Sequence, residues 1–249
     1  MPDRYLVRTG YRSRANPAYD NDRDSGTVWQ PDVYQIAARI AKSLGAGRII
    51  DIGCGRGAKL VEYHPRFKLT GLDFSSNIAH CRASYPFATW IDHDLEQTND
   101  LPLSAADLEE AVIVCADVVE LLLAPERLLA ALVRALDGAR ALLISTPERE
   151  LTNGTRHDGP PRNSCHVREW SVREFQALLT SSGLIYQSLG LTRSNDLTDQ
   201  AHTILAVLAP NQQVLDEIVP IVIDLEPSAP QHSVGRTRLL RAIRALTRS

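Results

Sequence analysis

The feature that most constrains the fold is a series of short apolar runs that alternate with segments of helical spacing. Seven runs read as strands: 48–52, 68–72, 88–91, 110–116, 139–144, 184–191 and 202–209. The stretch from Ala111 to Cys115 is apolar throughout, which is typical of a strand buried on both faces of a sheet. The last two runs are close in sequence, and this favours an antiparallel pair at a sheet edge.

The segments between these runs have helical features. Helices are predicted over 32–44, 58–62, 75–85, 125–136 and 171–182. We expect Ser75-Ser76-Asn77 to cap the third helix, and Ser171 with Glu174 to form a capping box on the last. The pattern therefore predicts an α/β fold with a doubly wound, mostly parallel, seven-stranded Rossmann-like sheet and an antiparallel edge strand.

The chain divides into three parts by composition. Residues 1–30 are a polar lead-in and a candidate cover for an active site, 31–209 hold the sheet, and 210–249 form a C-terminal extension. The extension ends in a basic amphipathic stretch, with Leu239, Leu240, Ile243 and Leu246 on one helical face. This face could pack on the domain or on a second subunit, or lie on an anionic membrane surface, and packing is the favoured alternative.

Charge and cysteine usage exclude several classes of protein. The formal net charge of -3 gives no reason to expect nucleic acid as a partner. The four cysteines are widely spaced without a Cys-x-x-Cys pair, so reduced thiols are expected. The start of the chain lacks the apolar core of a signal peptide, and no stretch approaches the roughly 20 apolar residues of a membrane span. We therefore expect a cytoplasmic protein.

Glycines follow the first apolar run, in Asp51-Ile52-Gly53-Cys54-Gly55-Arg56-Gly57. Between a strand and a helix, small residues let the backbone approach a ligand. Such a loop also occurs in dinucleotide-binding proteins and in plain tight turns. The Gly-x-Gly-x-Gly spacing, with Asp51 before the loop and Asp73 ending the next strand, is more specific than any one part.

These motifs resemble those of class I S-adenosylmethionine-dependent methyltransferases, over roughly residues 31–209. The loop from Asp51 to Gly57 matches the first family motif, and Gly71-Leu72-Asp73 matches the second. The resemblance implies that S-adenosyl-L-methionine is the cofactor, with Asp73 accepting hydrogen bonds from both ribose hydroxyls.

Two later elements extend the resemblance. In 90–96, Asp94 would meet the adenine amino group and Leu95 the ring, with Asp92 as the competing acid. The stretch 115–121 resembles the fourth element, beneath the methionine end, although Leu121 stands where many relatives have histidine. The predicted cofactor-binding residues are Gln30, Asp51, Gly53, Cys54, Gly55, Asp73, Phe74, Asp94, Leu95 and Cys115.

The predicted catalytic residues are His166, His157 and Glu120. His166 could act as a general base, or it could order its loop and cap the helix at Ser171. His157 and Asp158 could form a metal site with Glu148 or Glu120, but a solvated loop is favoured and no metal site is predicted.

The acceptor is expected to be a small molecule with a hydroxyl group. The segment 147–183 and the lead-in Trp29-Gln30-Pro31-Asp32-Val33-Tyr34 resemble bacterial sugar and secondary-metabolite O-methyltransferases, which implies a saccharide or glycoside. Methylation at nitrogen or carbon, and a non-catalytic S-adenosylmethionine-binding protein, stay open. A nicotinamide-dependent oxidoreductase is disfavoured by the glycine spacing. A homo-oligomer is a further expectation.

Overall fold

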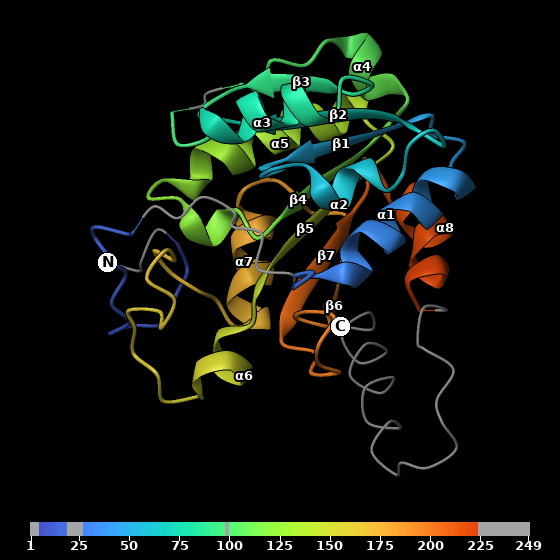
Figure 1. Cartoon of the computed structure of the whole chain (residues 1–249). Coiled ribbons are helices and arrows are strands. Elements are labelled where there is room, and N and C mark those ends of the chain that lie inside the picture. Colours follow the sequence, from blue (N-terminus) through green and yellow to red (C-terminus); the bar gives the residue numbers. More distant parts are fainter. Residues whose placement is uncertain (1–4, 19–26, 98–99, 224–249) are drawn as a thin grey trace.

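A seven-stranded sheet forms the centre of the computed structural model, which describes residues 5–18, 27–97 and 100–223. The strands are β1 (Arg48–Ile52), β2 (Lys68–Asp73), β3 (Thr89–Asp92), β4 (Ala111–Ala116), β5 (Ala141–Pro147), β6 (Gln187–Thr192) and β7 (Thr203–Leu208). Their order is β3-β2-β1-β4-β5-β7-β6, and β7 runs antiparallel to β5 and β6 (Figure 1). The predicted fold class is confirmed.

Helices cover both faces of this sheet (Figure 1). One face carries α1 (Pro31–Ser43), α2 (Ala58–Val61), α3 (Ser76–Ser84) and α8 (Gln212–Ile223). The other carries α4 (Ala105–Glu109), α5 (Pro125–Gly138) and α7 (Val172–Ser181). The short helices η1 (Val119–Leu121) and α6 (Arg149–Asn153) follow β4 and β5.

The strands feed two separate hydrophobic cores because successive side chains point to opposite faces. In β4, Ile113 packs toward α5 and α7, whereas Val112 and Val114 pack toward α1. All six residues of β4 are buried, as the apolar run predicts. Its parallel pairing with β1 and β5 sets the position of the residues that follow it at the carboxyl edge of the sheet.

Among the described residues, three α-helices and the short 3-10 helix η1 were not predicted. Helices α4 and α6 have only five residues each, too few to show a helical period. Helix α8 contains Pro220 and lies in the part of the chain predicted as an extension, yet Leu215 and Ile218 are buried in the core shared with α1. Residues 212–223 therefore pack onto the sheet, although they belong to the stretch predicted as an extension.

The capping predictions have mixed outcomes. Ser171 and Glu174 form the predicted capping box at the start of α7. Ser75 precedes α3 but makes no side-chain cap, so that prediction is wrong. Its backbone lies at φ 57°, and its N–H donates instead to the Asp92 carboxylate at 3.1 Å.

Two segments far apart in the sequence form a layer over the edge of the sheet. Residues 5–18 and 154–170, called here the edge layer, lie side by side in Figure 1. Backbone hydrogen bonds join them: Arg12 N to Asp158 O at 2.8 Å, Arg14 N to Val167 O at 2.7 Å and Ala18 N to Ser164 O at 2.9 Å. The Trp170 indole also donates to Tyr5 O at 2.9 Å. The lead-in is thus held against a loop that follows β5.

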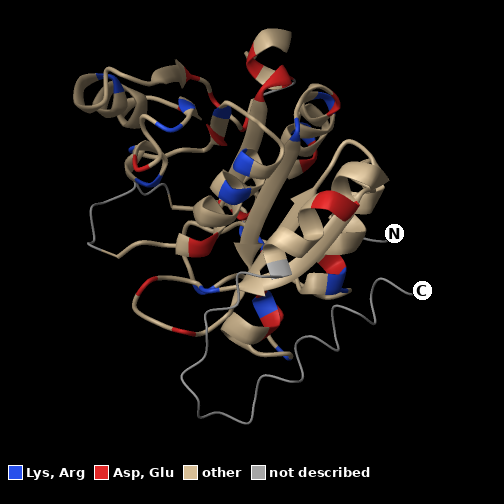
Figure 2. Cartoon of the chain, turned by 90° about the vertical axis from the view of Figure 1, so that its right-hand side faces the viewer, with Lys and Arg blue, Asp and Glu red and all other residues tan. Residues whose placement is uncertain are grey.

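Charged residues of both signs are interspersed along the elements that Figure 2 colours. No helix in the described ranges is long and apolar enough to cross a membrane. The basic amphipathic stretch predicted near the C-terminus lies outside the described residues.

Candidate functional site

The glycine loop after β1 packs too tightly for larger residues. Gly53 has φ 78°, and a Cβ there would lie 2.3 Å from Val118 Cγ2. Gly57 has φ 76°, and a Cβ there would lie 2.6 Å from the Trp90 ring. Because positive φ and close approach both exclude side chains, glycine is required at these two positions. Gly53 lines the cavity described below.

Asp73, at the end of β2, connects the loop to α3. One carboxylate oxygen accepts from Gly55 N at 2.9 Å, and the other accepts from Phe74 N at 2.8 Å and Asn77 Nδ2 at 3.1 Å. These donors fix the carboxylate beside the glycine loop. Asp73 therefore helps to shape the loop as well as facing the cavity described below.

Asp51 is a buried carboxyl group beneath the same loop. Tyr34 Oη donates to Asp51 Oδ2 at 2.9 Å, while Oδ1 has no partner among the described residues. Burial raises the pKa of Asp51 to about 7, with Asp73 adding to the effect, and Lys59 and the Tyr34 hydroxyl oppose it. An unpaired buried oxygen is costly unless a ligand group satisfies it. Asp51 is thus available to a hydrogen-bond donor placed on the loop.

A cavity of about 310 Å³ opens at this edge of the sheet. Four carboxylates line it, together with mostly apolar side chains. The lining residues are Pro17, Ala18, Gly53, Asp73, Phe74, Asp94, Leu95, Glu96, Asp117, Val118, Leu121, Leu122, Leu123 and Cys165. Five of the ten predicted cofactor-binding residues are among them: Gly53, Asp73, Phe74, Asp94 and Leu95.

The structure separates the two acids considered after β3. Asp94 lines the cavity and accepts from Glu96 N at 2.9 Å. Asp92 is not a lining residue, and it accepts from Ser75 N. The geometry therefore favours Asp94 over Asp92 as the acid that meets a ligand.

Asp117 is a lining residue that the sequence analysis did not single out. It follows β4 with φ 56°, and its carboxylate accepts a hydrogen bond from the Gln30 amide. The Ser145 hydroxyl in turn donates to Gln30 Oε1. Gln30 was predicted to bind the cofactor itself, but it is buried and reaches the cavity only through Asp117. A polar residue directly after a fully buried strand was the signal that could have found Asp117.

Glu120 lies behind Asp117 and is fully buried. It accepts from Thr146 Oγ1 at 3.0 Å. Burial raises the pKa of Glu120 well above its usual value, and the neighbouring Asp117 charge raises it further. Glu120 does not line the cavity, which argues against direct contact with a substrate. Its position instead supports the strand ends beneath the cavity.

Two predicted cofactor contacts differ from expectation. The Cys115 side chain is buried within β4 in the hydrophobic core, so it does not reach the cavity. The Cys54 thiol turns under the loop, 3.6 Å from Gly55 O. At these two positions only the backbone could meet a ligand, because the side chains pack inward.

The predicted base His166 lies beside the cavity but does not line it. Its Nδ1 is 2.6 Å from Glu169 Oε1, and its Nε2 is 3.0 Å from Asn163 Nδ2. The neighbouring Cys165 is the lining residue. Because both ring nitrogens have partners within the edge layer, the arrangement fits the loop-ordering alternative. The helix cap at Ser171 is made by Glu174 and not by His166.

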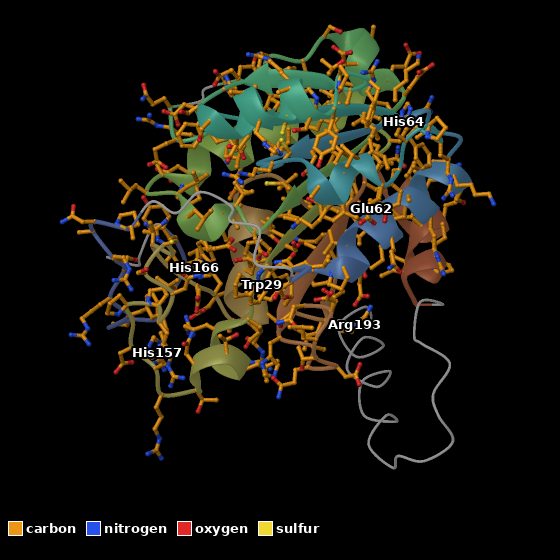
Figure 3. The ribbon with its side chains drawn as sticks, viewed as in Figure 1. Trp29, Glu62, His64, His157, His166 and Arg193 are labelled. Carbon is orange, nitrogen blue, oxygen red and sulfur yellow. The ribbon has the colours of Figure 1, made fainter. Side chains whose placement is uncertain are left out.

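The other predicted histidine is further from the cavity. His157 lies in the outer part of the edge layer, near α6 (Figure 3), and its Nδ1 accepts from Gly159 N at 3.3 Å. Asp158 pairs with Arg8, while Glu148 caps α6. Within the described ranges no cluster of three or more His, Cys, Asp or Glu side chains could hold a metal ion. The less favoured alternative, a metal site that combines His157 and Asp158 with Glu148 or Glu120, is therefore not assembled among the described residues.

Comparison with known families identifies the class of this fold and site. Residues 25–189 match the methyltransferase domain family, and the chain belongs to that family. It is also similar to a probable S-adenosylmethionine-dependent methyltransferase of Mycobacterium tuberculosis, found in strains CDC 1551 and H37Rv. This chain and the M. tuberculosis protein are 29% identical over 167 residues, which cover 66% of this chain and 58% of the relative. The match thus spans little more than half the length of that relative.

Solved structures share the fold at low identity. The methyltransferase domain of bacterial CtHen1-C has a TM-score of 0.51 at 21% identity, over 72% of this chain and 98% of that one. The N-terminal domain of EvdMO1, with SAH bound, has a TM-score of 0.51 at 17% identity, over 79% of this chain and 91% of that domain. The same domain in the presence of SAH and D-fucose has a TM-score of 0.50.

Proposed function

We propose that this chain is an S-adenosylmethionine-dependent methyltransferase that methylates a hydroxyl group of a small molecule, with a saccharide or glycoside as the acceptor class. The observation that carries the proposal is a cavity at the carboxyl edge of the sheet that Gly53, Asp73 and Asp94 line together. Parallel α/β sheets bind ligands at this edge.

The residues present fit the cofactor. Asp73 faces the cavity as an acceptor for ribose hydroxyls, while Asp94 and Leu95 offer an acid and an apolar surface for adenine. The unpaired Oδ1 of Asp51 beneath the loop suits the cationic amino group of the methionine moiety. The M. tuberculosis relative is named as an S-adenosylmethionine-dependent enzyme, and the EvdMO1 domain was solved with SAH. Both names support this choice of cofactor.

When bound, the cofactor supplies an electrophilic methyl group on a sulfonium. The contribution of the chain is to align the acceptor with that methyl group and to limit the access of water. Leu121, Leu122 and Leu123 form one apolar wall of the cavity, and Pro17, Ala18 and Cys165 of the edge layer line it as well. We propose that the lead-in covers the acceptor side in this way.

The choice of acceptor rests on less specific features. The segment after β5, which resembles that of sugar and secondary-metabolite O-methyltransferases, contributes residues 154–170 to the edge layer. The other resembling residues, 29–34, lie at the start of α1. The EvdMO1 domain was studied in the presence of D-fucose, which concerns that protein and suggests sugars as a first panel. Carboxylates near the cavity are available to accept a hydroxyl proton.

Calorimetry with S-adenosylmethionine, followed by a transfer assay on a panel of sugars, glycosides, phenols and amines, tests the proposal. We expect saturable cofactor binding, and formation of SAH with at least one hydroxyl acceptor. Failure to bind the cofactor would overturn the proposal. Methyl transfer only to amines would mean that the acceptor is an amine and not a hydroxyl group. Cofactor binding without any transfer would favour a non-catalytic role.

A further inference from the structure

Asp117 has a left-handed backbone conformation that residues other than glycine rarely adopt. Its φ of 56° follows directly on the extended strand β4. Non-glycine residues in this region cost free energy, and they persist where surrounding contacts hold them and where a function uses the geometry. Asp117 N donates to Ser145 O at 3.2 Å, which ties the turn to β5. The turn directs the residue into the cavity that it lines.

A buried relay of polar side chains holds the Asp117 carboxylate. Gln30 is 1% exposed and Ser145 is 0% exposed, so neither side chain exchanges its partners freely with water. Ser145 donates to the Gln30 oxygen, and the Gln30 amide nitrogen donates to Asp117 Oδ1. Since the amide donates to the carboxylate, the relay favours the ionised form of Asp117.

The neighbouring Glu120 is less easily ionised than an ordinary glutamate. Glu120 is fully buried, and burial together with the Asp117 charge raises its pKa well above the usual value. Two nearby carboxyl groups in one site cannot both ionise easily. The buried Glu120 is therefore the harder of the two to ionise, and Asp117 is the carboxylate that lies at the cavity wall.

The order of strands places Asp117 relative to the other acids. Along the sheet edge, β3, β2, β1 and β4 are consecutive, so Asp94, Asp73, the glycine loop and Asp117 follow one another in that order. The close approach of Val118 to Gly53 shows that the turn after β4 packs directly on the loop. Asp73 and Asp117 thus flank the loop on opposite sides.

We propose that Asp117 supplies the negative charge by which this site prefers the sulfonium of S-adenosylmethionine to the uncharged thioether of SAH, and that Gln30 positions it. This inference rests on the proposed function. If adenine lies at Asp94 and ribose at Asp73, the sulfonium lies beyond the ribose, toward β4. A carboxylate there stabilises the charged cofactor and favours release of the neutral product.

Dissociation constants for S-adenosylmethionine and SAH, measured by calorimetry on the full chain, test this inference without an acceptor. Asp117→Asn removes the charge, and asparagine tolerates the left-handed backbone better than most residues. We expect the preference for S-adenosylmethionine over SAH to fall about tenfold, a conservative value for one charge at short range. The affinity for SAH should change less than about twofold, because SAH has no sulfonium for Asp117 to stabilise.

Two further variants separate this role from a structural one. Gln30→Met should shift the preference in the same direction by a smaller factor, because it loosens the carboxylate without removing its charge. Asp94→Asn, which changes another lining carboxylate, should weaken both ligands equally. Thermal melts of each variant check that it folds.

The outcomes are distinct. Equal weakening of both ligands in Asp117→Asn would mean that Asp117 binds a group that they share, such as the amino group, and would overturn the inference. An unchanged preference would also overturn it. Wild-type protein that binds neither ligand would instead refute the proposed function, which is a different result from any change in the ratio.

Discussion

The cofactor side and the acceptor side of the cavity differ in how far apart their residues lie in the sequence. Gly53, Asp73 and Asp94 follow three successive strands, which belong to two consecutive βαβ units. The edge layer instead joins residues 5–18 to residues 154–170 across most of the chain. Local motifs therefore specify the first side, whereas long-range hydrogen bonds and ion pairs specify the second.

The edge layer depends on a buried ion pair, so its loss should have the largest effect. Arg149 is 1% exposed, donates to both carboxylate oxygens of Glu174 at 2.6 and 3.0 Å, and lies over the Tyr11 ring. Arg149→Met should destabilise the protein by about 3 kcal/mol, because the largely buried Glu174 loses its charged partner and keeps only backbone donors such as Arg8 N. Chemical denaturation measures this change.

The control for this variant is Arg173→Met, at an exposed position of α7 next to Glu174, which should change stability by less than about 0.5 kcal/mol. Hydrogen exchange should show faster exchange in residues 5–18 for Arg149→Met, with the glycine loop unchanged. Faster exchange at the loop would show that the two sides are not separable.

On the cofactor side, Asp51 predicts a pH dependence of stability. Its pKa of about 7 in the folded state lies above the ordinary value of 3.8. Between these values the folded protein holds a proton that the unfolded chain has lost, so stability falls as pH rises through this window. Asp51→Asn should remove this loss, making the variant more stable relative to wild type at pH 8 than at pH 5, by about 2.5 kcal/mol, the equivalent of the two pH units between pH 5 and the folded pKa.

Denaturation curves at both pH values measure this difference. Glu62→Gln, at an exposed position, is the matched control and should show little pH-dependent change. An Asp51→Asn difference that is the same at both pH values would contradict the burial argument.

Asp73 tests the ribose assignment. Asp73→Ala should weaken binding of S-adenosylmethionine by at least about 1.5–3 kcal/mol, the value of a hydrogen bond to a charged acceptor. Calorimetry measures it, with Asp92→Ala as the comparison, since Asp92 does not line the cavity. An unchanged dissociation constant in a folded Asp73→Ala protein would remove Asp73 from the ribose site.

His166 should have the smallest effect on catalysis. Its ring contacts Glu169 and Asn163, so we expect His166→Ala to leave cofactor affinity unchanged and to lower turnover less than about tenfold. The assay uses whichever acceptor the panel identifies. A fall of about 10² to 10⁴ would restore the general-base hypothesis, because general bases contribute that much.

The same contrast explains what the sequence could predict. The alternation of strands and helices, the glycine loop and the acids at the ends of β2 and β3 are local patterns, and each could be read from neighbouring residues. The position of His166 could not be predicted from neighbouring residues, because it depends on the contact with Glu169 and on the packing of residues 5–18 against its loop. Gln30 was predicted near the site, but its hydrogen bond to Asp117 could not be predicted, because the two residues are 87 positions apart in the sequence.

The central claim is that the cavity at the carboxyl edge binds the adenosyl cofactor, and a crystal structure of the protein with SAH tests it most directly. We expect the ribose hydroxyls within hydrogen-bond distance of Asp73, the adenine beside Asp94 and Leu95, and the thioether toward Asp117. SAH bound elsewhere on the protein, or bound here with its ribose away from Asp73, would contradict the account.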